Sequence, residues 1–288
     1  MIVGAPKAGT TSLHSYLGQH PGIRAHPQRE FAFFTDEAAY ARGYQHAWQL
    51  YFADARPDQA LAGKYVAMMY SMTAMRRLKL HNPDVQVVLV LRDPVARAYS
   101  EYWYARRRGR ERADTFEIAV RRCLDATDED PLQRNAYLAR GQYMQYLERI
   151  YDLFSPTQVN VLLLEQIAQD PVASCQSLFR KIDNLDAGFA PCADRRENTA
   201  AEARSGFLLS LMSDRRRFGR LRRGLRALVN ERTKQRIKSA LQRLNDRPFT
   251  PPAMNEPTRR QLVEYFSPWN RRLAETLGVS LERWTSSR

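Results

Sequence analysis

Residues 4–12 carry the groups that a phosphate-binding loop needs. Glycines let the backbone approach an anion closely, and the helix expected after the loop offers free amide groups and the positive end of its dipole. The spacing of the two glycines matches the G-x-x-x-x-G of nucleoside-triphosphate loops, but Thr10 and Thr11 stand where those loops carry Lys and then Ser or Thr. The lysine lies inside the loop instead, at Lys7. The pattern predicts a phosphate site with an unusually placed lysine.

The position of Lys7 determines what the loop can do chemically. A lysine inside the loop can meet the bridging oxygen of a group that is being cleaved, and the hydroxyls of Thr10, Thr11 and Ser12 can bind phosphate oxygens. None of these hydroxyls has the position of a standard magnesium ligand beside a loop lysine. The alternative is a helix that follows a glycine turn and binds no ligand.

A second anion anchor is predicted at Arg92, directly after the apolar run 85–91. Open α/β sheets bind ligands at the carboxyl ends of their strands, and arginine offers a planar fork of donors for a phosphate. Ser100 lies eight residues later on the expected helix and can complete this site. The alternative is an internal ion pair between Arg92 and Asp93 at the helix start. Two anchors on successive strands imply a ligand with phosphates at two ends.

Strand and helix signals alternate in the part of the chain that holds these residues. This order predicts an α/β fold with a P-loop-like central parallel sheet flanked by helices, followed by a helical, basic carboxyl-terminal extension. We expect a single domain over 1–288, with a ligand-binding core at 1–185 and the helical part at 186–288. Residues 23–60 are expected to be rich in loops and carry a cluster of aromatic residues. The expected strands are 2–4, 60–69, 85–91 and 159–164, and the expected helices are 10–19, 95–108, 115–124, 137–154, 170–182 and 259–277.

The positive charge is concentrated in one window of the chain. The formal net charge is +14, and residues 214–243 hold 12 Lys or Arg against 2 Asp or Glu. Leucines at helical spacing predict one or two amphipathic helices there. Such a window is either a solvated helix face or a surface for an acidic polymer or a membrane. Nucleic acid is the least favoured partner, because no recognisable nucleic-acid-binding motif accompanies the charge.

The composition excludes several classes of protein. A content of 44% hydrophobic and 26% charged residues is ordinary for a globular chain and excludes disorder throughout. No apolar run approaches the roughly 20 residues of a membrane-spanning helix. Three widely spaced cysteines, Cys123, Cys175 and Cys192, fit neither a disulfide framework nor a metal site. We therefore expect a cytoplasmic protein, with peripheral attachment to a membrane as the alternative.

Taken together, these motifs resemble the sulfotransferases that use 3′-phosphoadenosine-5′-phosphosulfate (PAPS), especially bacterial and heparan-sulfate-type members. Residues 4–12 resemble the loop that binds the 5′-phosphosulfate, and Arg92 and Ser100 resemble the pair that binds the 3′-phosphate. The likeness covers about residues 1–185 and the last 30 or so. Further segments in the family's order are 17–21, 29–34, 91–94, 161–165, 170–171 and 277–284.

The resemblance implies transfer of a sulfuryl group from PAPS to a hydroxyl or amine of a carbohydrate or related metabolite, without a metal. Lys7 would stabilise the leaving oxygen, and Glu30, which precedes an aromatic run, would be the base for the acceptor. Lys64 matches a lysine that contacts PAPS and acceptor in heparan-type members. Ala32 and Thr35 replace a His and an Asp of the family near the base, which bears on the acceptor. The implied donor-binding residues are Lys7, Ala8, Gly9, Thr10, Thr11, Ser12, Arg92 and Ser100.

Other interpretations of single features remain open at this point. Glu30 can be a surface residue paired with Arg29. The whole chain can be a P-loop kinase or NTPase, against which the displaced lysine counts. It can also be a non-catalytic basic module for membranes or polyanions. The five histidines, His14 and His20 among them, match no catalytic motif, and we expect them to be structural.

Overall fold

The computed structural model describes residues 1–27, 30–126, 130–133, 135–193, 201–203, 246–248 and 250–285. Arg29 and the basic window 214–243 lie outside the described residues, so what the sequence predicts for them stays a prediction. Among the described helices, none combines the length and the apolar character that crossing a membrane requires.

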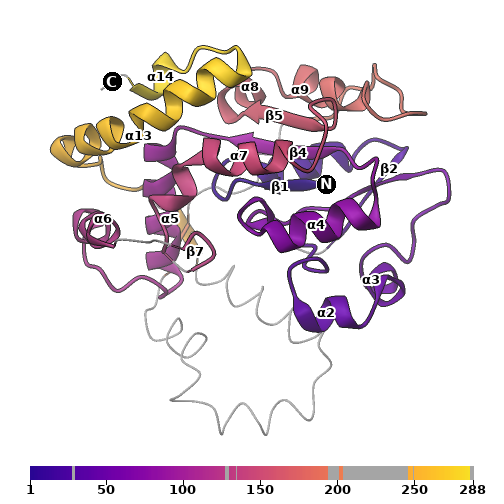
Figure 1. Cartoon of the computed structure of the whole chain (residues 1–288), viewed down its shortest axis with the longest axis horizontal. Helices are drawn as coiled ribbons and strands as arrows, with labels where there is room; N and C mark the ends of the chain where they lie inside the picture. Colours follow the sequence, from indigo (N-terminus) through magenta and orange to yellow (C-terminus); the bar gives the residue numbers. More distant parts are fainter. Residues whose placement is uncertain are drawn as a thin grey trace, which may run out of the picture.

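A parallel sheet stands at the centre of the structure, with the strand order β1-β4-β5 (Figure 1). A second parallel pair, β2 with β3, is joined to it where Lys64 forms a bridge with Ile2. Every residue of β1 and β4 is buried, which accounts for the continuous apolar run before Arg92. The predicted central parallel sheet flanked by helices is confirmed. The strands are β1 (Ile2–Gly4), β2 (Ile23–Ala25), β3 (Ala60–Ala62), β4 (Val87–Leu91) and β5 (Val159–Leu163).

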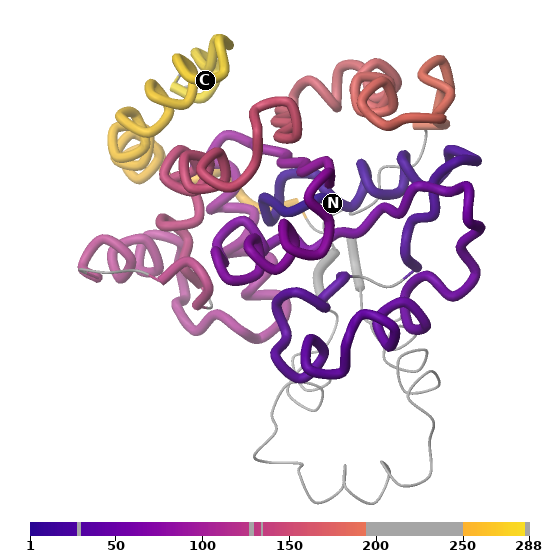
Figure 2. The backbone as a smooth tube through the Cα atoms, turned by 45° about the vertical axis from the view of Figure 1, so that its right-hand side comes forward, coloured from indigo at the N-terminus to yellow at the C-terminus, as the bar shows by residue number. Residues whose placement is uncertain are grey.

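Helices follow most strands, and a helical carboxyl-terminal part is present as expected. Figures 1 and 2 show the carboxyl-terminal helices, in yellow, on the far side of the sheet from α2 and α3. The α-helices are α1 (Thr10–Leu17), α2 (Glu37–Ala41), α3 (Tyr44–Tyr51), α4 (Met72–His81), α5 (Pro94–Arg107), α6 (Phe116–Asp125), α7 (Tyr143–Tyr151), α8 (Leu164–Gln169), α9 (Pro171–Phe179), α13 (Glu256–Leu277) and α14 (Glu282–Thr285). Two 3-10 helices, η1 (Met68–Tyr70) and η2 (Ala139–Gly141), and the antiparallel strands β6 (Ala201–Ala203) and β7 (Asp246–Pro248) complete the described elements.

Residues 23–60 are more regular than the sequence suggests. They contain β2, α2 and α3, which the sequence analysis assigned to loops. Aromatic rings hold these short elements together: the Phe31 and Tyr51 ring centroids are 4.7 Å apart, and those of Phe33 and Phe34 are 5.0 Å apart. Large rings bury enough apolar area to fix helices too short to be stable alone.

The helix expected at 137–154 begins later, because α7 starts at Tyr143. The carbonyl of Tyr137 accepts a hydrogen bond from the Arg97 guanidinium, and the carbonyl of Ala139 accepts one from the Tyr146 hydroxyl at 3.1 Å. These two side chains fix the backbone of residues 137–139, where the Ala139 carbonyl also accepts from the Gln142 amide at 3.2 Å in a 3-10 turn. Tertiary contacts override the local helical pattern at this point.

A second core lies between α5, α6 and α13, and it contains buried charges. The side chain of Arg97 is 0% exposed and donates to Glu101 at 2.5 Å, one turn along α5. Arg140 donates to the other oxygen of Glu101. A charge buried in this way needs such partners, because the desolvation of an unpaired ion is expensive. The arginine on α5 therefore ties that helix to the segment before α7.

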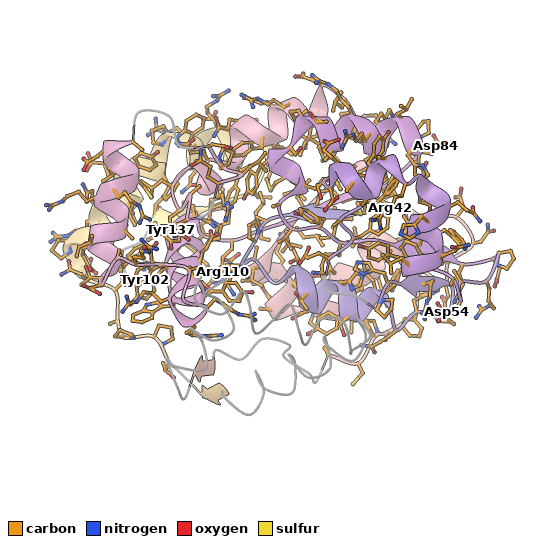
Figure 3. All side chains as sticks on the ribbon, turned by 90° about the horizontal axis from the view of Figure 1, so that it is seen from below. Arg42, Asp54, Asp84, Tyr102, Arg110 and Tyr137 are labelled. Atoms are coloured by element: carbon orange, nitrogen blue, oxygen red, sulfur yellow. The ribbon has the colours of Figure 1, made fainter. Side chains whose placement is uncertain are left out.

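Glu111 forms a second buried polar cluster in the same core. Its carboxylate accepts hydrogen bonds from Arg122, from the Ala113 amide and from the Tyr137 hydroxyl. Burial alone would raise the pKa of Glu111, but these hydrogen bonds outweigh it and lower the pKa to about 2. Tyr137 also packs against Tyr102, with ring centroids 6.2 Å apart; Figure 3 labels both, near Arg110.

His14 and His26 are buried between α1 and the β2–β3 pair. His14 Nε2 donates to the carbonyl of Ala62 at 3.1 Å, and the two imidazole centroids are 4.6 Å apart. Burial lowers the pKa of His14 to about 4; the hydrogen bond to Ala62 acts in the opposite direction, and the charge of Lys64 lowers the pKa further. His14 is thus a neutral packing residue at neutral pH.

We predict that this buried histidine makes the fold sensitive to acid. The unfolded chain takes up a proton at His14 near pH 6.5, whereas the folded chain does so only near pH 4. The contribution of neutral His14 to the free energy of unfolding is therefore fully present above about pH 6.5. About 3 kcal/mol of it is lost as the pH falls toward 4. Urea unfolding between pH 7 and 4.5 should show a shallower pH dependence for His14→Gln than for the wild type. His46→Gln, at an exposed position of α3, should keep the wild-type slope; equal slopes in all three proteins would contradict the assignment.

Candidate functional site

The glycine loop connects β1 to α1 and is fixed to both neighbouring strands. The amide of Ala5 donates to the carbonyl of Val90 in β4 at 2.8 Å. Gly9 has a positive φ of 85°, and a Cβ atom there would lie 2.6 Å from Cδ1 of Leu164, the first residue of α8, directly after β5. Only glycine combines that backbone conformation with that close approach. The loop is therefore pressed against the carboxyl ends of β4 and β5.

Lys7 lies at the tip of this loop in the left-handed region, with φ 68°. Its carbonyl accepts a hydrogen bond from Arg92 Nη1 at 3.1 Å. Its ammonium nitrogen lies 4.4 Å from the ring centroid of Tyr104 on α5. The two anion anchors predicted from separate parts of the sequence are thus in direct contact.

The remaining loop residues lie at the start of α1. Ala8 and Thr10 are buried, whereas Thr11 and Ser12 are half-buried in the first turn. Their amides and hydroxyls are at the amino-terminal end of the helix, where a bound anion is stabilised. Ser100 is half-buried on α5, which begins just after Arg92.

Arg92 is hydrogen-bonded to the glycine loop and to α7. The Tyr143 hydroxyl of α7 donates to the Arg92 carbonyl at 2.9 Å. Burial lowers the pKa of Arg92, while Tyr143, Asp93 and Glu165 act in the opposite direction. Asp93 caps α5 by accepting a hydrogen bond from the Val95 amide at 2.9 Å. An arginine that remains charged in a partly desolvated position is well suited to bind a phosphate.

Glu30 and Lys64 form an ion pair beside β1. Lys64 Nζ lies 2.9 Å from Glu30 Oε1, and the Val66 amide donates to Glu30 Oε2 at 3.0 Å. The Lys64 side chain is only 2% exposed, whereas that of Glu30 is 28% exposed. The backbone of Lys64 is itself fixed, because its amide donates to His26 Nε2 at 3.1 Å. A buried lysine therefore orients a carboxylate that still reaches the surface.

Ala32 and Thr35, where the family resemblance expects a His and an Asp, close a turn after Glu30. The Thr35 hydroxyl donates to the Ala32 carbonyl at 3.1 Å, and the Thr35 amide donates to the same carbonyl at 3.0 Å. These positions serve the local backbone here.

Three contacts of the site are not predicted by the sequence. The Tyr143 hydroxyl binds the Arg92 carbonyl, and the Tyr104 ring lies beside Lys7. The third joins Glu165 and Trp284, which belong to segments that resemble the family. The Trp284 indole of α14 donates to Glu165 at 3.3 Å, and its ring lies 6.3 Å from that of Tyr143. A link from the end of the chain to Arg92 depends on long-range packing, for which the local sequence contains no signal.

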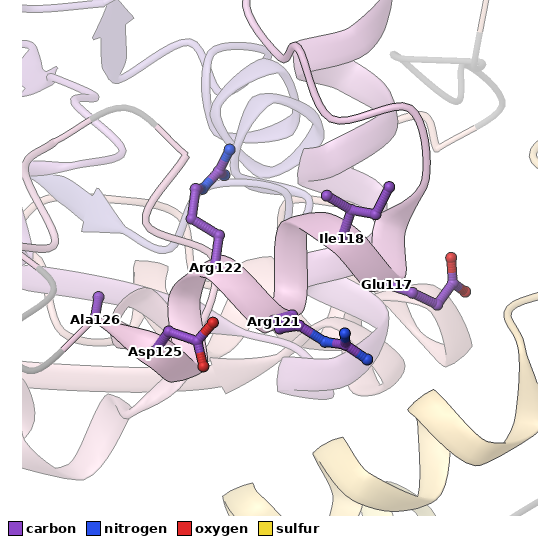
Figure 4. A pocket seen from close by; sticks show the side chains of 6 residues that line it. All are labelled: Glu117, Ile118, Arg121, Arg122, Asp125 and Ala126. Atoms are coloured by element: carbon purple, nitrogen blue, oxygen red, sulfur yellow. The ribbon is translucent and has the colours of Figure 1, made fainter.

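A separate hollow of about 620 Å³ lies along α6, on the second core (Figure 4). Ile118 is 55% exposed there, and Arg122 also pairs with Glu111. The residues that line the hollow are Glu117, Ile118, Arg121, Arg122, Asp125 and Ala126. None of them belongs to the glycine loop or to the Glu30–Lys64 pair, so this hollow is distinct from the candidate site. Among the described residues, no group of three His, Cys, Asp or Glu side chains is arranged to hold a metal ion.

Comparison with known proteins places this geometry in context. The chain is 24% identical to the human bifunctional heparan sulfate N-deacetylase/N-sulfotransferase 3, over 74% of this chain and 25% of the relative. It is 25% identical to the human enzyme numbered 2 of the same name, over 62% of this chain and 21% of the relative. The chain thus spans about a quarter of the length of these curated relatives.

The fold is also similar to that of a solved structure. The crystal structure of a sulfotransferase from Alicyclobacillus acidocaldarius matches with a TM-score of 0.70 and 23% identity, over 99% of this chain and 97% of the other. The family profile described as "Sulfotransferase domain" matches residues 1–183, a range that includes the glycine loop, Glu30, Lys64, Arg92 and Ser100. The chain therefore belongs to the sulfotransferase domain family.

Proposed function

We propose that the protein transfers a sulfuryl group from PAPS to a hydroxyl or amine of a carbohydrate or related metabolite. The observation that carries this proposal is the hydrogen bond from Arg92 Nη1 to the carbonyl of Lys7. It brings the loop lysine and the second anchor together at one edge of the sheet, as a ligand with phosphates at two ends requires. The names of the relatives, which specify N-sulfotransfer on heparan sulfate, support an acceptor of the glycan class.

The donor would be bound at both of its ends. The amides and hydroxyls of Gly9, Thr10, Thr11 and Ser12, with the backbone at Ala8, would bind the 5′-phosphosulfate. Arg92 and Ser100 would bind the 3′-phosphate. The burial of Arg92 strengthens its interaction with an anion, because the local dielectric constant is lower than that of water.

Sulfuryl transfer would follow the pattern of phosphoryl transfer, with in-line attack and negative charge growing on the leaving oxygen. Lys7 is the cation nearest to that oxygen in the proposed arrangement. Glu30 would take the proton of the acceptor, and Lys64 would fix its orientation through the 2.9 Å contact. The 28% exposure of Glu30 leaves the carboxylate accessible to an acceptor that arrives from solvent.

The role of Lys7 predicts a specific loss in Lys7→Ala. With labelled PAPS, the kcat should fall about 100- to 1,000-fold, because one preorganised donor at the leaving oxygen is removed. The KM for PAPS should change much less, since the loop amides and Arg92 remain. Lys181→Ala, at an exposed position just beyond α9, is the matched control and should retain activity. Full turnover in Lys7→Ala would exclude this role, and magnesium-dependent ATP turnover by the wild type would favour a kinase instead.

The Glu30–Lys64 pair predicts a separation between donor binding and catalysis. Glu30→Gln keeps an oxygen for the Val66 amide but cannot accept a proton, so the kcat should fall about 100- to 10,000-fold. The affinity for PAPS, measured by calorimetry, should stay close to that of the wild type. Glu37→Gln, which removes an exposed carboxylate paired with Arg77, is the control and should be active. A Glu30→Gln variant with near wild-type kcat would mean that another group is the base.

A further inference from the structure

Tyr104 belongs to a stripe of residues that faces the glycine loop. Ser100 and Tyr104 lie four residues apart on the same face of α5, and Arg108 follows at the same spacing as the residue that caps the helix. The contact between Lys7 and the Tyr104 ring shows that this face is turned toward the loop. Ser100 is the residue of the stripe nearest to Arg92 in the chain, so Tyr104 lies one turn beyond the second anchor.

The Tyr104 ring lies within the range of a cation–π interaction with Lys7. The distance of 4.4 Å from Lys7 Nζ to the ring centroid is inside the roughly 6 Å over which the ring quadrupole attracts a cation. Arg108 approaches the same ring, with Cζ 5.1 Å from the centroid. One ring therefore contacts two cations, of which Lys7 belongs to the loop.

The backbone of Lys7 is fixed independently of this ring. Its φ of 68° is set by the loop, and its carbonyl is bound by Arg92. The lysine side chain has four rotatable bonds, so a fixed backbone does not by itself determine where the ammonium lies. Tyr104 fixes the other end of the side chain.

We propose that Tyr104 is a positioning residue that holds the Lys7 ammonium beside the donor site. Its consequence for catalysis rests on the proposed function, in which Lys7 stabilises the leaving oxygen. An ammonium group binds a phosphosulfate anion more strongly than it binds an aromatic ring. A bound donor can therefore attract the Lys7 ammonium away from the ring and toward the leaving oxygen. Without the ring, the lysine would lose the contact that orients its ammonium group.

The first test measures Lys7 directly and needs no catalysis. The folded protein is treated with limiting acetic anhydride, and acetylation of each lysine is quantified by mass spectrometry. In Tyr104→Leu, Lys7 should react about three- to tenfold faster than in the wild type, because a stabilising contact of the ammonium is lost. Tyr104→Phe keeps the ring and should react as the wild type does. Lys79, which donates to the Pro83 carbonyl at 2.9 Å, is the internal control for intact folding.

The second test measures the kinetic consequence. Tyr104→Leu should lower the kcat about three- to tenfold and leave the KM for PAPS within about twofold, whereas Tyr104→Phe should restore the kcat. If Lys7 reacts equally in wild type and Tyr104→Leu while Lys79 is unchanged, the proposal for Tyr104 is wrong, even if the protein transfers sulfuryl groups. If Lys7 becomes more reactive but the wild type has no transfer activity, Tyr104 does hold Lys7, and the proposed function is what fails.

Discussion

The parallel pairing of β1 with β4 is the constraint on which the site depends. Because the two strands run in the same direction, the glycine loop after β1 and Arg92 after β4 emerge at the same edge of the sheet. The hydrogen bond from Ala5 to Val90 extends this pairing into the loop. The contact between Arg92 and the Lys7 carbonyl follows from this arrangement. A shift in the register of β1 would separate the glycine loop from Arg92, although the sequence of both anchors would be unchanged.

Two ion pairs of the described residues place a cation in the interior of the protein. Arg97 is fully buried with Glu101, and Lys64 is almost fully buried with Glu30. The first pair lies in the second core, where both side chains are at most 10% exposed, which indicates a role in packing. The second pair joins a buried cation to a carboxylate that reaches the surface, which is the arrangement expected of a group that must be oriented and still meet a substrate. Exposure therefore distinguishes a structural pair from a candidate catalytic one.

The sequence predicts the strands and the loop well, because their signals are local. The apolar run before Arg92 is typical of a buried strand, the glycines around Lys7 are typical of a tight loop, and the predicted parallel fold is confirmed. The sequence does not predict the local structure correctly where contacts between distant residues determine it. Tyr137 lies outside a helix because Arg97 binds its carbonyl, and α2 and α3 form because aromatic rings from several segments meet. The partnership of Glu30 with Lys64, 34 residues apart, likewise required the folded chain.

The central claim is that one nucleotide contacts both anchors, and its most direct test is a comparison of ligands. Titration calorimetry would measure 3′-phosphoadenosine-5′-phosphate and adenosine 5′-phosphate, which lacks the 3′-phosphate, against the wild type and Arg92→Ala. We predict that the wild type binds the 3′-phosphorylated nucleotide about 100-fold more tightly, as expected for a charge-assisted contact from Arg92. Arg92→Ala should lose most of this preference. Equal affinities of the wild type for the two nucleotides would contradict the account.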